Sequence, residues 1–265
     1  MTAEPLPLKV SVLGVGISLL DMDRAIAALD RCIAEGRKEA EGRKEYVCVT
    51  GVHGVIESQS DPDLMAIHNA AGLVVPDGMP VVWMARALSK QPVGRVCGFD
   101  LTPAFAAHSV DRGYRHFFYG GAPGVPEQLR DRLTNRYPGL QVVGTLSPPF
   151  RLPTPEEDAE MVAAINAARP DVVWVGLSTP KQERWMAAHR DRLDAAILIG
   201  VGAAFDVEAG LKSRAPRWTH GIGLEWLYRL LVEPRRLWRR YAVIVPTFLV
   251  LAARQLVRHR FRQKS

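Results

Sequence analysis

Short runs of β-branched and aromatic residues alternate with longer amphipathic segments along most of this chain, and the alternation restricts its fold more than any other feature. Strands are expected at residues 46–50, 73–75, 115–119, 140–144, 171–176 and 195–201. Helices are expected between them, at residues 62–70, 79–88, 125–136, 155–168 and 181–190. This order is typical of an α/β protein in which a mainly parallel, Rossmann-like sheet is flanked by helices. Ligands of such sheets bind outside the carboxyl ends of the strands.

The C-terminal part of the chain differs from the rest in charge. Residues 211–265 carry 13 Lys and Arg against 2 Asp and Glu, a local charge of +11. The remaining 21 basic and 26 acidic residues give the upstream part a charge of −5. We therefore expect an α/β core over residues 1–210 and a basic helical C-terminal appendage over residues 211–265. A polyanion or an anionic membrane is the natural partner of such a tail.

Composition and cysteine usage place the chain among ordinary globular proteins. Hydrophobic residues make up 48% and charged residues 23%, which argues against wholesale disorder. The three cysteines, Cys32, Cys48 and Cys97, are far apart and odd in number, which suits a reducing compartment better than a disulfide framework. The first residues show no secretory signal, so a cytoplasmic protein is expected.

Asp77 is the acid whose position most needs an explanation. It lies in VVPDGMPVVW, between an apolar run that resembles a buried strand and one that resembles a helix. A carboxylate at such a place is costly unless it is paired or takes part in chemistry. Pro-Asp-Gly is also ordinary turn chemistry and Asp a favoured N-cap, so spacing alone favours a turn or a helix cap.

Other motifs also admit a structural explanation. The turn 120–124 (GGAPG) would let the backbone approach a diphosphate, or it needs glycine only for its backbone angles. The segment 178–183 (STPKQE) follows a strand and would pass for a capped helix start. The DxD strings at 21–23 and 61–63 are interpreted as helix caps rather than metal ligands. The pairs of glycines at 14–16 and 200–202 lack the third glycine of a dinucleotide fingerprint, which argues against an oxidoreductase.

Eight segments occur in an order that resembles one protein family. They are TGVHGVIES, VVPDGMPVVW, GRVCGFD, YGGAPGV, TPKQE, GAAFD, RAP and LEWLYRL. Together they resemble the WecG/TagA/CpsF family of bacterial glycosyltransferases over residues 10–245. The resemblance favours a chemical role for Asp77 over a cap.

The resemblance implies a metal-independent, inverting transfer of a sugar from a UDP-sugar to a polyprenyl-diphosphate-linked sugar, in surface polysaccharide or teichoic-acid biosynthesis, with no cofactor. By position, Asp77 matches the general base, Thr50 and Arg95 the active-site threonine and arginine, and Gln182 the glutamine beside the substrate. One departure concerns the donor. Many members carry Thr-x-Asn where this chain has Thr50-Gly51-Val52, so an N-acetylmannosamine-type or uronate donor is in doubt and glucose is an alternative.

The chemistry is consistent with one carboxylate and several cations. An inverting transfer needs a single base to take the acceptor proton, whereas a second carboxylate acting as nucleophile would imply retention. Without a metal, arginines and backbone N–H groups must stabilise the departing diphosphate. The residues expected to bind substrate are Gly120, Gly121, Gly124, Lys181, Glu183, Gly202, Asp206, Lys212, Arg214, Arg217 and Arg229.

The run 241–253 (YAVIVPTFLVLAA) is flanked by arginines and raises a membrane question. Its 13 residues are too few to cross a bilayer, which needs about 20, so an interfacial segment on anionic lipid is expected, with an ordinary buried helix as the alternative. The expected location is peripheral, on the cytoplasmic face of the bacterial inner membrane, and self-association is compatible with its apolar helix faces.

Two functions of other classes would use the same tail. A non-catalytic membrane adaptor would need the tail but not Asp77, Arg95 or Gln182. A nucleic-acid-binding protein would use the +11 charge, but no aromatic platforms are interleaved with the basic residues, so no nucleic-acid partner is expected.

Overall fold

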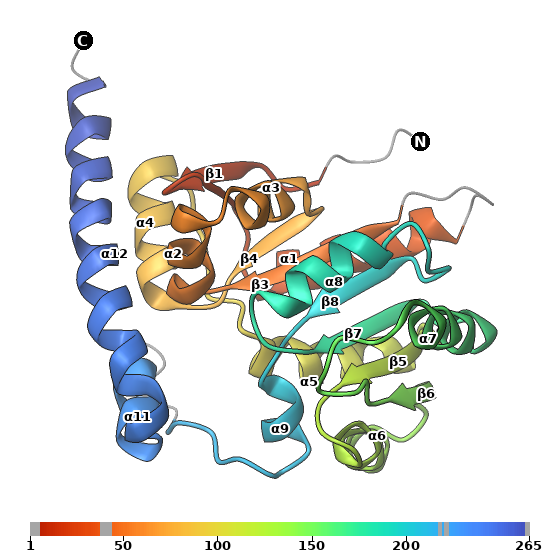
Figure 1. Cartoon of the computed structure of the whole chain (residues 1–265). Coiled ribbons are helices and arrows are strands. Elements are labelled where there is room, and N and C mark those ends of the chain that lie inside the picture. The colour runs from red at the N-terminus through yellow and green to blue at the C-terminus, as the bar shows by residue number, and fades with distance from the viewer. Residues whose placement is uncertain (1–5, 38–43, 217–218, 220–222, 263–265) are drawn as a thin grey trace.

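The computed structural model describes residues 6–37, 44–216, 219 and 223–262, apart from the side chain of Arg236. Its centre is a six-stranded sheet in the order β4-β3-β8-β7-β5-β6, with every pair parallel (Figure 1). The strands are β3 (Glu45–Thr50), β4 (Leu73–Pro76), β5 (Arg115–Gly120), β6 (Gln141–Leu146), β7 (Val172–Gly176) and β8 (Ile197–Gly200). The predicted parallel α/β fold is confirmed. The ends of each predicted strand lie within two residues of the observed ends.

Helices cover both faces of this sheet, and the side chains of each strand alternate between them. Val47 and Val49 belong to one core cluster, whereas Tyr46 and Cys48 belong to the other, as the period of two in a strand requires. The first cluster is closed by α1 (Met22–Gly36), α5 (Gly98–Val110), α6 (Val125–Arg136) and α9 (Ala204–Glu208). The second is closed by α2 (Val52–Ser60), α3 (Pro62–Ala70), α4 (Met79–Ser89), α7 (Pro155–Ala167) and α8 (Lys181–His189).

A two-stranded antiparallel hairpin precedes the sheet and was not predicted. Its strands are β1 (Lys9–Val12) and β2 (Val15–Ser18), joined by Leu13 and Gly14, both with positive φ. The Ser18 hydroxyl accepts a hydrogen bond from the Val74 backbone N–H (3.0 Å), which ties the hairpin to β4. β4 (LVVP) and β8 (ILIG) are equally short but are continuous apolar runs, whereas the hairpin strands KVSV and VGIS are interrupted by Lys9, Ser11 and Gly16 and give a weaker signal.

The chain changes direction across the sheet next to β3. From β3 it moves outward to β4, and it then returns to the other side of β3, where β5, β6, β7 and β8 lie. A crevice at the carboxyl ends is expected where successive connections diverge in this way. Thr50 ends β3 and Asp77 follows β4, so both lie at this edge.

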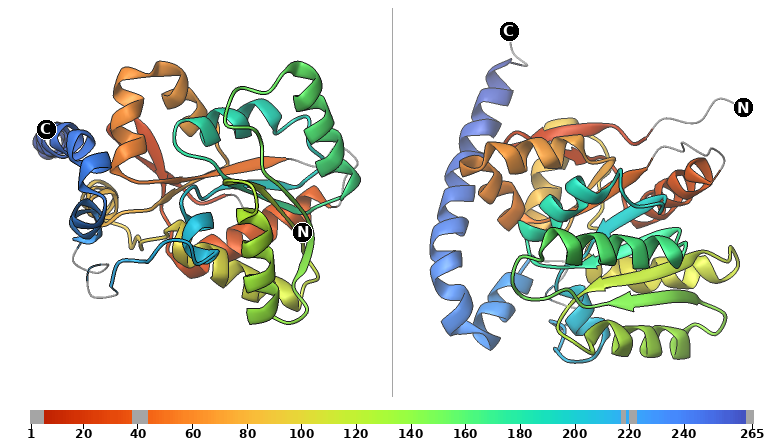
Figure 2. Two further views of the ribbon diagram at one scale, coloured as in Figure 1. Left: turned by 60° about the horizontal axis from the view of Figure 1, so that its bottom comes forward. Right: turned by 45° about the vertical axis from the view of Figure 1, so that its right-hand side comes forward.

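The described part of the C-terminal appendage includes two helices that lie beside the core. They are α11 (Glu225–Val232) and α12 (Pro234–Arg262), and α12 runs along α2 and α4 (Figures 1 and 2). Ile244, Phe248 and Ala252 of α12 are buried in the core cluster of that side. The Gln255 amide also bonds the hairpin turn, accepting from Leu13 N (3.0 Å) and donating to Ser11 O (2.7 Å).

The run 241–253 is the middle of α12 and not a short separate segment. The prediction that it is too short to cross a membrane used its 13 residues, whereas the continuous stretch Leu237–Arg262 is long and apolar enough by length and composition. One face of α12 nevertheless packs on the protein. Its other face exposes large apolar side chains, namely Trp238, Val243, Leu249, Val250, Val257 and Phe261. The alternative of an ordinary buried helix therefore does not describe α12.

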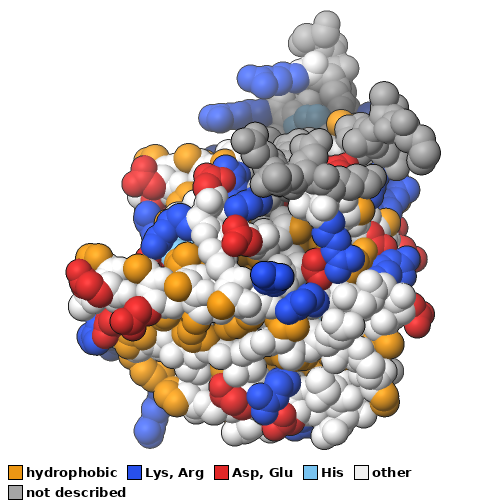
Figure 3. Space-filling model, turned by 90° about the vertical axis from the view of Figure 1, so that its right-hand side faces the viewer, with side chains coloured by type: hydrophobic (Ala, Val, Ile, Leu, Met, Phe, Trp, Pro, Cys, Tyr) orange, Lys and Arg blue, Asp and Glu red, His pale blue; other side chains and the backbone are white. Residues whose placement is uncertain are grey.

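The opposite side of the molecule carries a different kind of surface. Figure 3 shows the face turned away from α12, where acidic and basic side chains are interspersed with small apolar patches. Such mixed charge is usual for a solvated protein surface. The concentration of arginines at both ends of the apolar part of α12 is therefore a local property of the appendage.

Candidate functional site

The candidate site begins where β3 and β4 end. Thr50 pairs with Pro76 in the sheet, and the Asp77 backbone N–H donates to Thr50 O at 3.0 Å. The Thr50 hydroxyl oxygen is buried, and none of the described residues hydrogen-bonds to it. Gly51 follows without a side chain, and a Cβ there would lie 3.8 Å from the Asp77 carboxylate. The end of β3 thus leaves the Asp77 carboxylate and a free hydroxyl on one side of the sheet edge.

Asp77 is not a helix cap, contrary to what spacing alone favours. The N-cap of α4 is Gly78, which has no side chain to bond. Within the described part of the chain, no group donates a hydrogen bond to the Asp77 carboxylate. Burial raises the pKa of Asp77 to about 7, with Arg95 and Arg229 opposing this effect and Glu225 and Asp100 adding to it. The side chain still keeps partial solvent access, so a proton could enter and leave near neutral pH.

Arg95 lies beside Asp77 because its segment is bonded to the end of β4. The Val96 N–H donates to Pro76 O and the Gly94 N–H to Leu20 O, both at 2.9 Å. The Arg95 side chain is 13% exposed and donates to Glu225 Oε2 at 2.5 Å. Its second terminal nitrogen lies 3.6 Å from Asp100 Oδ2. Arg95 is therefore a partly desolvated cation joined to both the core and the appendage.

Arg214 completes this ion-pair arrangement from the segment that precedes α11. Its guanidinium donates to Asp100 Oδ1 at 2.5 Å and lies over the Phe99 ring. Asp100 also accepts from the Cys97 thiol (3.0 Å), and these donors hold the pKa of Asp100 below its ordinary value against the effect of burial. The buried Nε of Arg214 has no partner among the described residues.

Gln182 and Glu183 open α8 at the neighbouring strand ends. The Gln182 amide nitrogen donates to Glu183 Oε1 (3.0 Å), which also accepts from the Thr179 hydroxyl (2.9 Å). The buried Gln182 carbonyl oxygen has no partner within the described residues, and a Cβ on Gly202 would lie 3.3 Å from it. Because a carboxylate only accepts, Glu183 orients the amide so that its oxygen faces Gly202. Glu183 itself is 1% exposed, and burial raises its pKa.

The glycine-rich turn after β5 has a packing reason for at least one of its glycines. Gly120, Gly121 and Gly124 all have positive φ. A Cβ on Gly120 would lie 2.6 Å from the backbone of Gly176, so a side chain here would clash where the paired strands β5 and β7 end. The turn leads directly into α6, with Gly124 as its N-cap.

The remaining predicted residues differ in how open they are. Lys181 is exposed at the start of α8. Asp206 and Lys212 pair with each other at 2.6 Å, so neither is free in this structure. The side chain of Arg229 has no hydrogen bond or ion pair with another described residue, and its charge affects the pKa of both Asp77 and His53. Arg217 lies outside the described residues.

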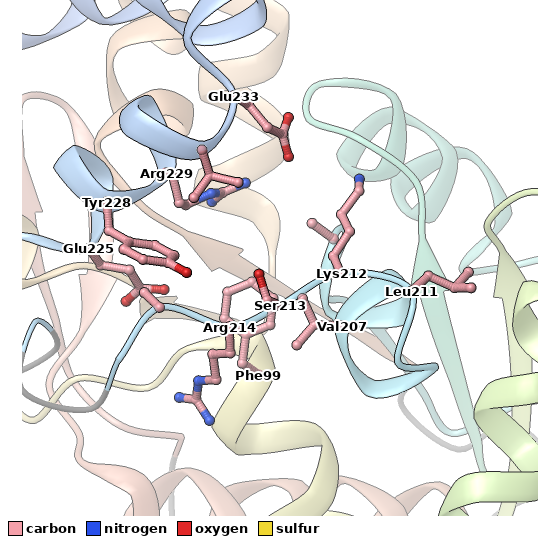
Figure 4. A pocket seen from close by; sticks show the side chains of 13 residues that line it. Phe99, Val207, Leu211, Lys212, Ser213, Arg214, Glu225, Tyr228, Arg229 and Glu233 are labelled. Carbon is pink, nitrogen blue, oxygen red and sulfur yellow. The ribbon is translucent and has the colours of Figure 1, made fainter.

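A cavity of about 250 Å³ separates the core from α11. Figure 4 shows Glu225, Tyr228 and Arg229 of α11 on one side and Leu211, Lys212 and Val207 on the other. Phe99, Arg214, Val232 and Glu233 also line it. The cavity therefore combines an apolar lining with both signs of charge. Among the described residues no group of three or more His, Cys, Asp or Glu is arranged to hold a metal ion.

Sequence reasoning identified Asp77, Thr50 and Arg95, which the structure brings together, and Gln182 at the same sheet edge. It did not single out Glu225 or Asp100, the two carboxylates that engage Arg95. The available signal for Glu225 was that it is one of only two acids in the basic appendage.

Comparison with known proteins identifies a family. The model of a family described as "Glycosyl transferase WecG/TagA/CpsF family" matches residues 10–262. An N-acetylglucosaminyldiphosphoundecaprenol N-acetyl-beta-D-mannosaminyltransferase of Bacillus spizizenii is 32% identical over 184 residues, which is 69% of this chain and 69% of that protein. A protein of the same name from Bacillus subtilis is 31% identical over 181 residues, 68% of each chain.

Proposed function

This chain belongs to the WecG/TagA/CpsF family of glycosyltransferases, and from that premise we propose that it transfers a sugar from a UDP-sugar to a polyprenyl-diphosphate-linked sugar. The two relatives are named for an acceptor in which N-acetylglucosamine is linked through a diphosphate to undecaprenol. We propose the same acceptor class here, in the synthesis of a surface polysaccharide or teichoic-acid linkage. Family membership shows that the chain is an enzyme. It therefore argues against the two alternative functions, a non-catalytic membrane adaptor and a nucleic-acid-binding protein.

The state of Asp77 carries the proposal. Its carboxylate lies at the carboxyl edge of the sheet without a hydrogen-bond donor from the described residues, and its pKa is about 7. A general base works best when its pKa is near the working pH. Asp77 would take the proton of the acceptor hydroxyl while that oxygen attacks the anomeric carbon from the side opposite the leaving UDP. A direct attack of this kind inverts the configuration of the anomeric carbon.

The roles of the neighbouring groups follow from their contacts. Arg95 and Arg229 would stabilise the charge that develops on the departing diphosphate, as cations near a leaving group do. Arg214, Lys212 and Arg217 would contribute from the appendage. The free oxygens of Thr50 and Gln182 would orient the sugar. We propose that these cations take the place of a metal ion, and activity that is lost with a chelator and restored by a divalent cation would contradict this.

For the donor sugar we propose only a chemical class. The relatives' names specify an N-acetylmannosaminyl donor, but this chain has Val52 at the position of the expected asparagine. His53 lies next to it, and its pKa is lowered by burial and by the charges of Arg240 and Arg229. A neutral imidazole could replace an amide as a hydrogen-bonding partner of the sugar. We therefore propose a donor of the N-acetylmannosamine or uronate type, with glucose as the alternative.

The appendage would place the enzyme on the cytoplasmic surface of the inner membrane. One face of α12 packs on α2 and α4, and the other exposes apolar side chains with arginines at both ends. Such a helix is suited to the boundary between headgroups and acyl chains of an anionic membrane. The same exposed surface could support self-association.

The experiment is a transfer assay read by mass spectrometry. A polyprenyl-diphosphate-linked N-acetylglucosamine acceptor is incubated with a panel of UDP-sugars, using wild type and Asp77→Asn in parallel. The proposal expects one hexose-type mass gain that depends on one donor and is lost in the variant. Transfer that is undiminished in Asp77→Asn would remove Asp77 as the base, and no transfer from any donor in the panel would contradict the proposed substrates.

A further inference from the structure

Glu225 is a carboxylate of the appendage that forms an ion pair with Arg95 at the carboxyl edge of the sheet. It is the first residue of α11, and its Oε2 accepts from Arg95 at 2.5 Å. Arg95 in turn faces Asp100, and Asp100 binds Arg214. Four charges of alternating sign therefore form one chain, which we call the ion-pair chain. Its two ends, Glu225 and Arg214, come from the appendage, and its middle comes from the core.

The ion-pair chain is electrically neutral, which is unfavourable for an anionic ligand. The side chains of Arg95 and Glu225 are only 13% and 18% exposed, so water screens their charges weakly. A diphosphate that approaches Arg95 would meet Glu225 and Asp100 at the same place. Like charges in a desolvated site repel strongly, so tight binding of a diphosphate requires one carboxylate to move away or become protonated.

Glu225 is better placed to move than Asp100. Asp100 has the Arg214 guanidinium and the Cys97 thiol as donors in addition to Arg95. Glu225 lines the cavity of about 250 Å³, and no residue of α11 is buried. A shift of the start of α11 away from Arg95 would therefore break little packing with the core.

Carboxylate and phosphate oxygens are equivalent acceptors for a guanidinium group. We propose that Glu225 holds the place on Arg95 that the diphosphate of a substrate takes, so that ligand binding releases the start of α11 from the core. The inference rests on the proposed function only in taking the ligand to be a diphosphate. It adds that the appendage is coupled to occupancy of the site through this one contact.

Titration calorimetry with UDP on the full-length protein tests whether a diphosphate replaces Glu225 on Arg95, which we call the exchange. Glu225→Gln removes the charge of Glu225 from Arg95 and leaves that of Asp100, and we expect UDP to bind about tenfold more tightly than to wild type, which corresponds to about 1.4 kcal/mol. Glu233→Gln is the matched control, because Glu233 lines the same cavity without pairing with Arg95. Its effect on the UDP affinity should remain below about threefold.

A double-mutant cycle separates exchange from a general effect of charge. In an Arg95→Gln background, Glu225→Gln should leave the UDP affinity nearly unchanged, because the contact that it removes no longer exists. Equal tightening by Glu225→Gln and Glu233→Gln, or no tightening by Glu225→Gln, would overturn the exchange. Thermal unfolding verifies that each variant is folded. A protein that shows the expected cycle with UDP but transfers no sugar would overturn the proposed function and leave the exchange standing.

Discussion

Asp61 and Asp77 stand at the starts of two neighbouring helices, α3 and α4, with a proline close behind each, and yet the structure treats them in opposite ways. Asp61 accepts a hydrogen bond from the Leu64 backbone N–H (3.0 Å) and another from Arg184 (2.5 Å). The first of these bonds is the main reason why the pKa of Asp61 is lowered. Asp77 has no such donor in the described structure, and burial raises its pKa to about 7.

The difference teaches what separates a structural carboxylate from a reactive one. Donors that favour the charged form make an aspartate a fixed part of the helix start, as in Asp61. Removal of water without donors leaves a carboxylate that binds a proton at neutral pH, as in Asp77. The local sequence is similar in both places, so the surroundings decide the role.

The largest effect is expected for catalysis. Asp77→Asn should lower the rate of sugar transfer by a factor of about 100 or more, because an amide cannot accept the proton of the acceptor hydroxyl. Asp61→Asn should leave the rate within about twofold, because its side chain acts only on a helix end. The rate is measured as product formed per time from one donor and one acceptor.

The pH dependence of the same assay sharpens this result. The base works when ionised, so kcat/KM of wild type should rise with pH through about 7 and level off above it. A profile without an inflection near this pH would contradict the role of Asp77.

The second effect concerns stability. Asp77→Asn should lower the activity but raise the free energy of unfolding. The folded pKa of Asp77 exceeds its ordinary value of 3.8, so ionisation destabilises the folded state, and stability is lost as the pH rises from about 4 to about 7. Asp77→Asn should therefore raise the free energy of unfolding relative to wild type by about 2 kcal/mol more at pH 8 than at pH 5, after allowance for its partial exposure. Chemical denaturation at both pH values measures the difference, and an equal effect at the two would contradict it.

Glu183 combines properties of the two aspartates. Burial raises its pKa, as it does for Asp77, but its carboxylate accepts hydrogen bonds, as that of Asp61 does. Glu183→Leu removes the acceptor that orients the Gln182 amide, and kcat/KM should fall by about tenfold. Glu183→Gln keeps a carbonyl oxygen for the same two donors and should retain most of the activity. Both variants are assayed with the same donor and acceptor, together with thermal unfolding. Equal losses in the two variants would show that orientation of Gln182 is not the reason.

The smallest effect is expected for Asp61→Ala. Because its folded pKa is below the ordinary value, the contribution of Asp61 to stability is present above about pH 4 and is lost as the pH falls below it. The variant should be slightly less stable than wild type at pH 7, and the difference should disappear in acid. The change is measured by denaturation at pH 7 and pH 3. A difference that persists at the lower pH would mean that the carboxylate charge is not what stabilises α3.

Much of the fold could be predicted from the chain because its signals are local. The helix 62–70 was predicted with its observed ends, since Asp61 and Pro62 are strong start signals. The DxD strings were correctly interpreted as caps, with Asp21 accepting from Arg24 N and Asp61 from Leu64 N. The hairpin β1–β2 and the length of α12 were not predicted, because the hairpin strands are short and interrupted by polar residues or glycine, and α12 continues through charged residues.

The candidate site could be predicted only in part. Asp77 was identifiable because it directly follows a predicted strand, whereas Thr50 was identified through the family resemblance. The contact of Arg95 with Glu225 joins a loop to the first residue of α11, which is distant in sequence, and no local pattern contains it. The resemblance named the residues of the site, but it did not say which charges lie opposite each other.

The sequence by itself determined that this protein is a parallel α/β protein with a basic appendage and an aspartate directly after one strand. These properties depend on periodicity and net charge, which are sums over neighbouring residues. That the protein is an enzyme followed from the resemblance of its motifs to a family. Only the tertiary structure decided that the pKa of Asp77 is raised to about 7 while that of Asp61 is lowered. A pKa depends on the water removed from a group and on the charges around it. For Asp77 those charges are Arg95, Asp100, Glu225 and Arg229, which come together only when the appendage packs against the core.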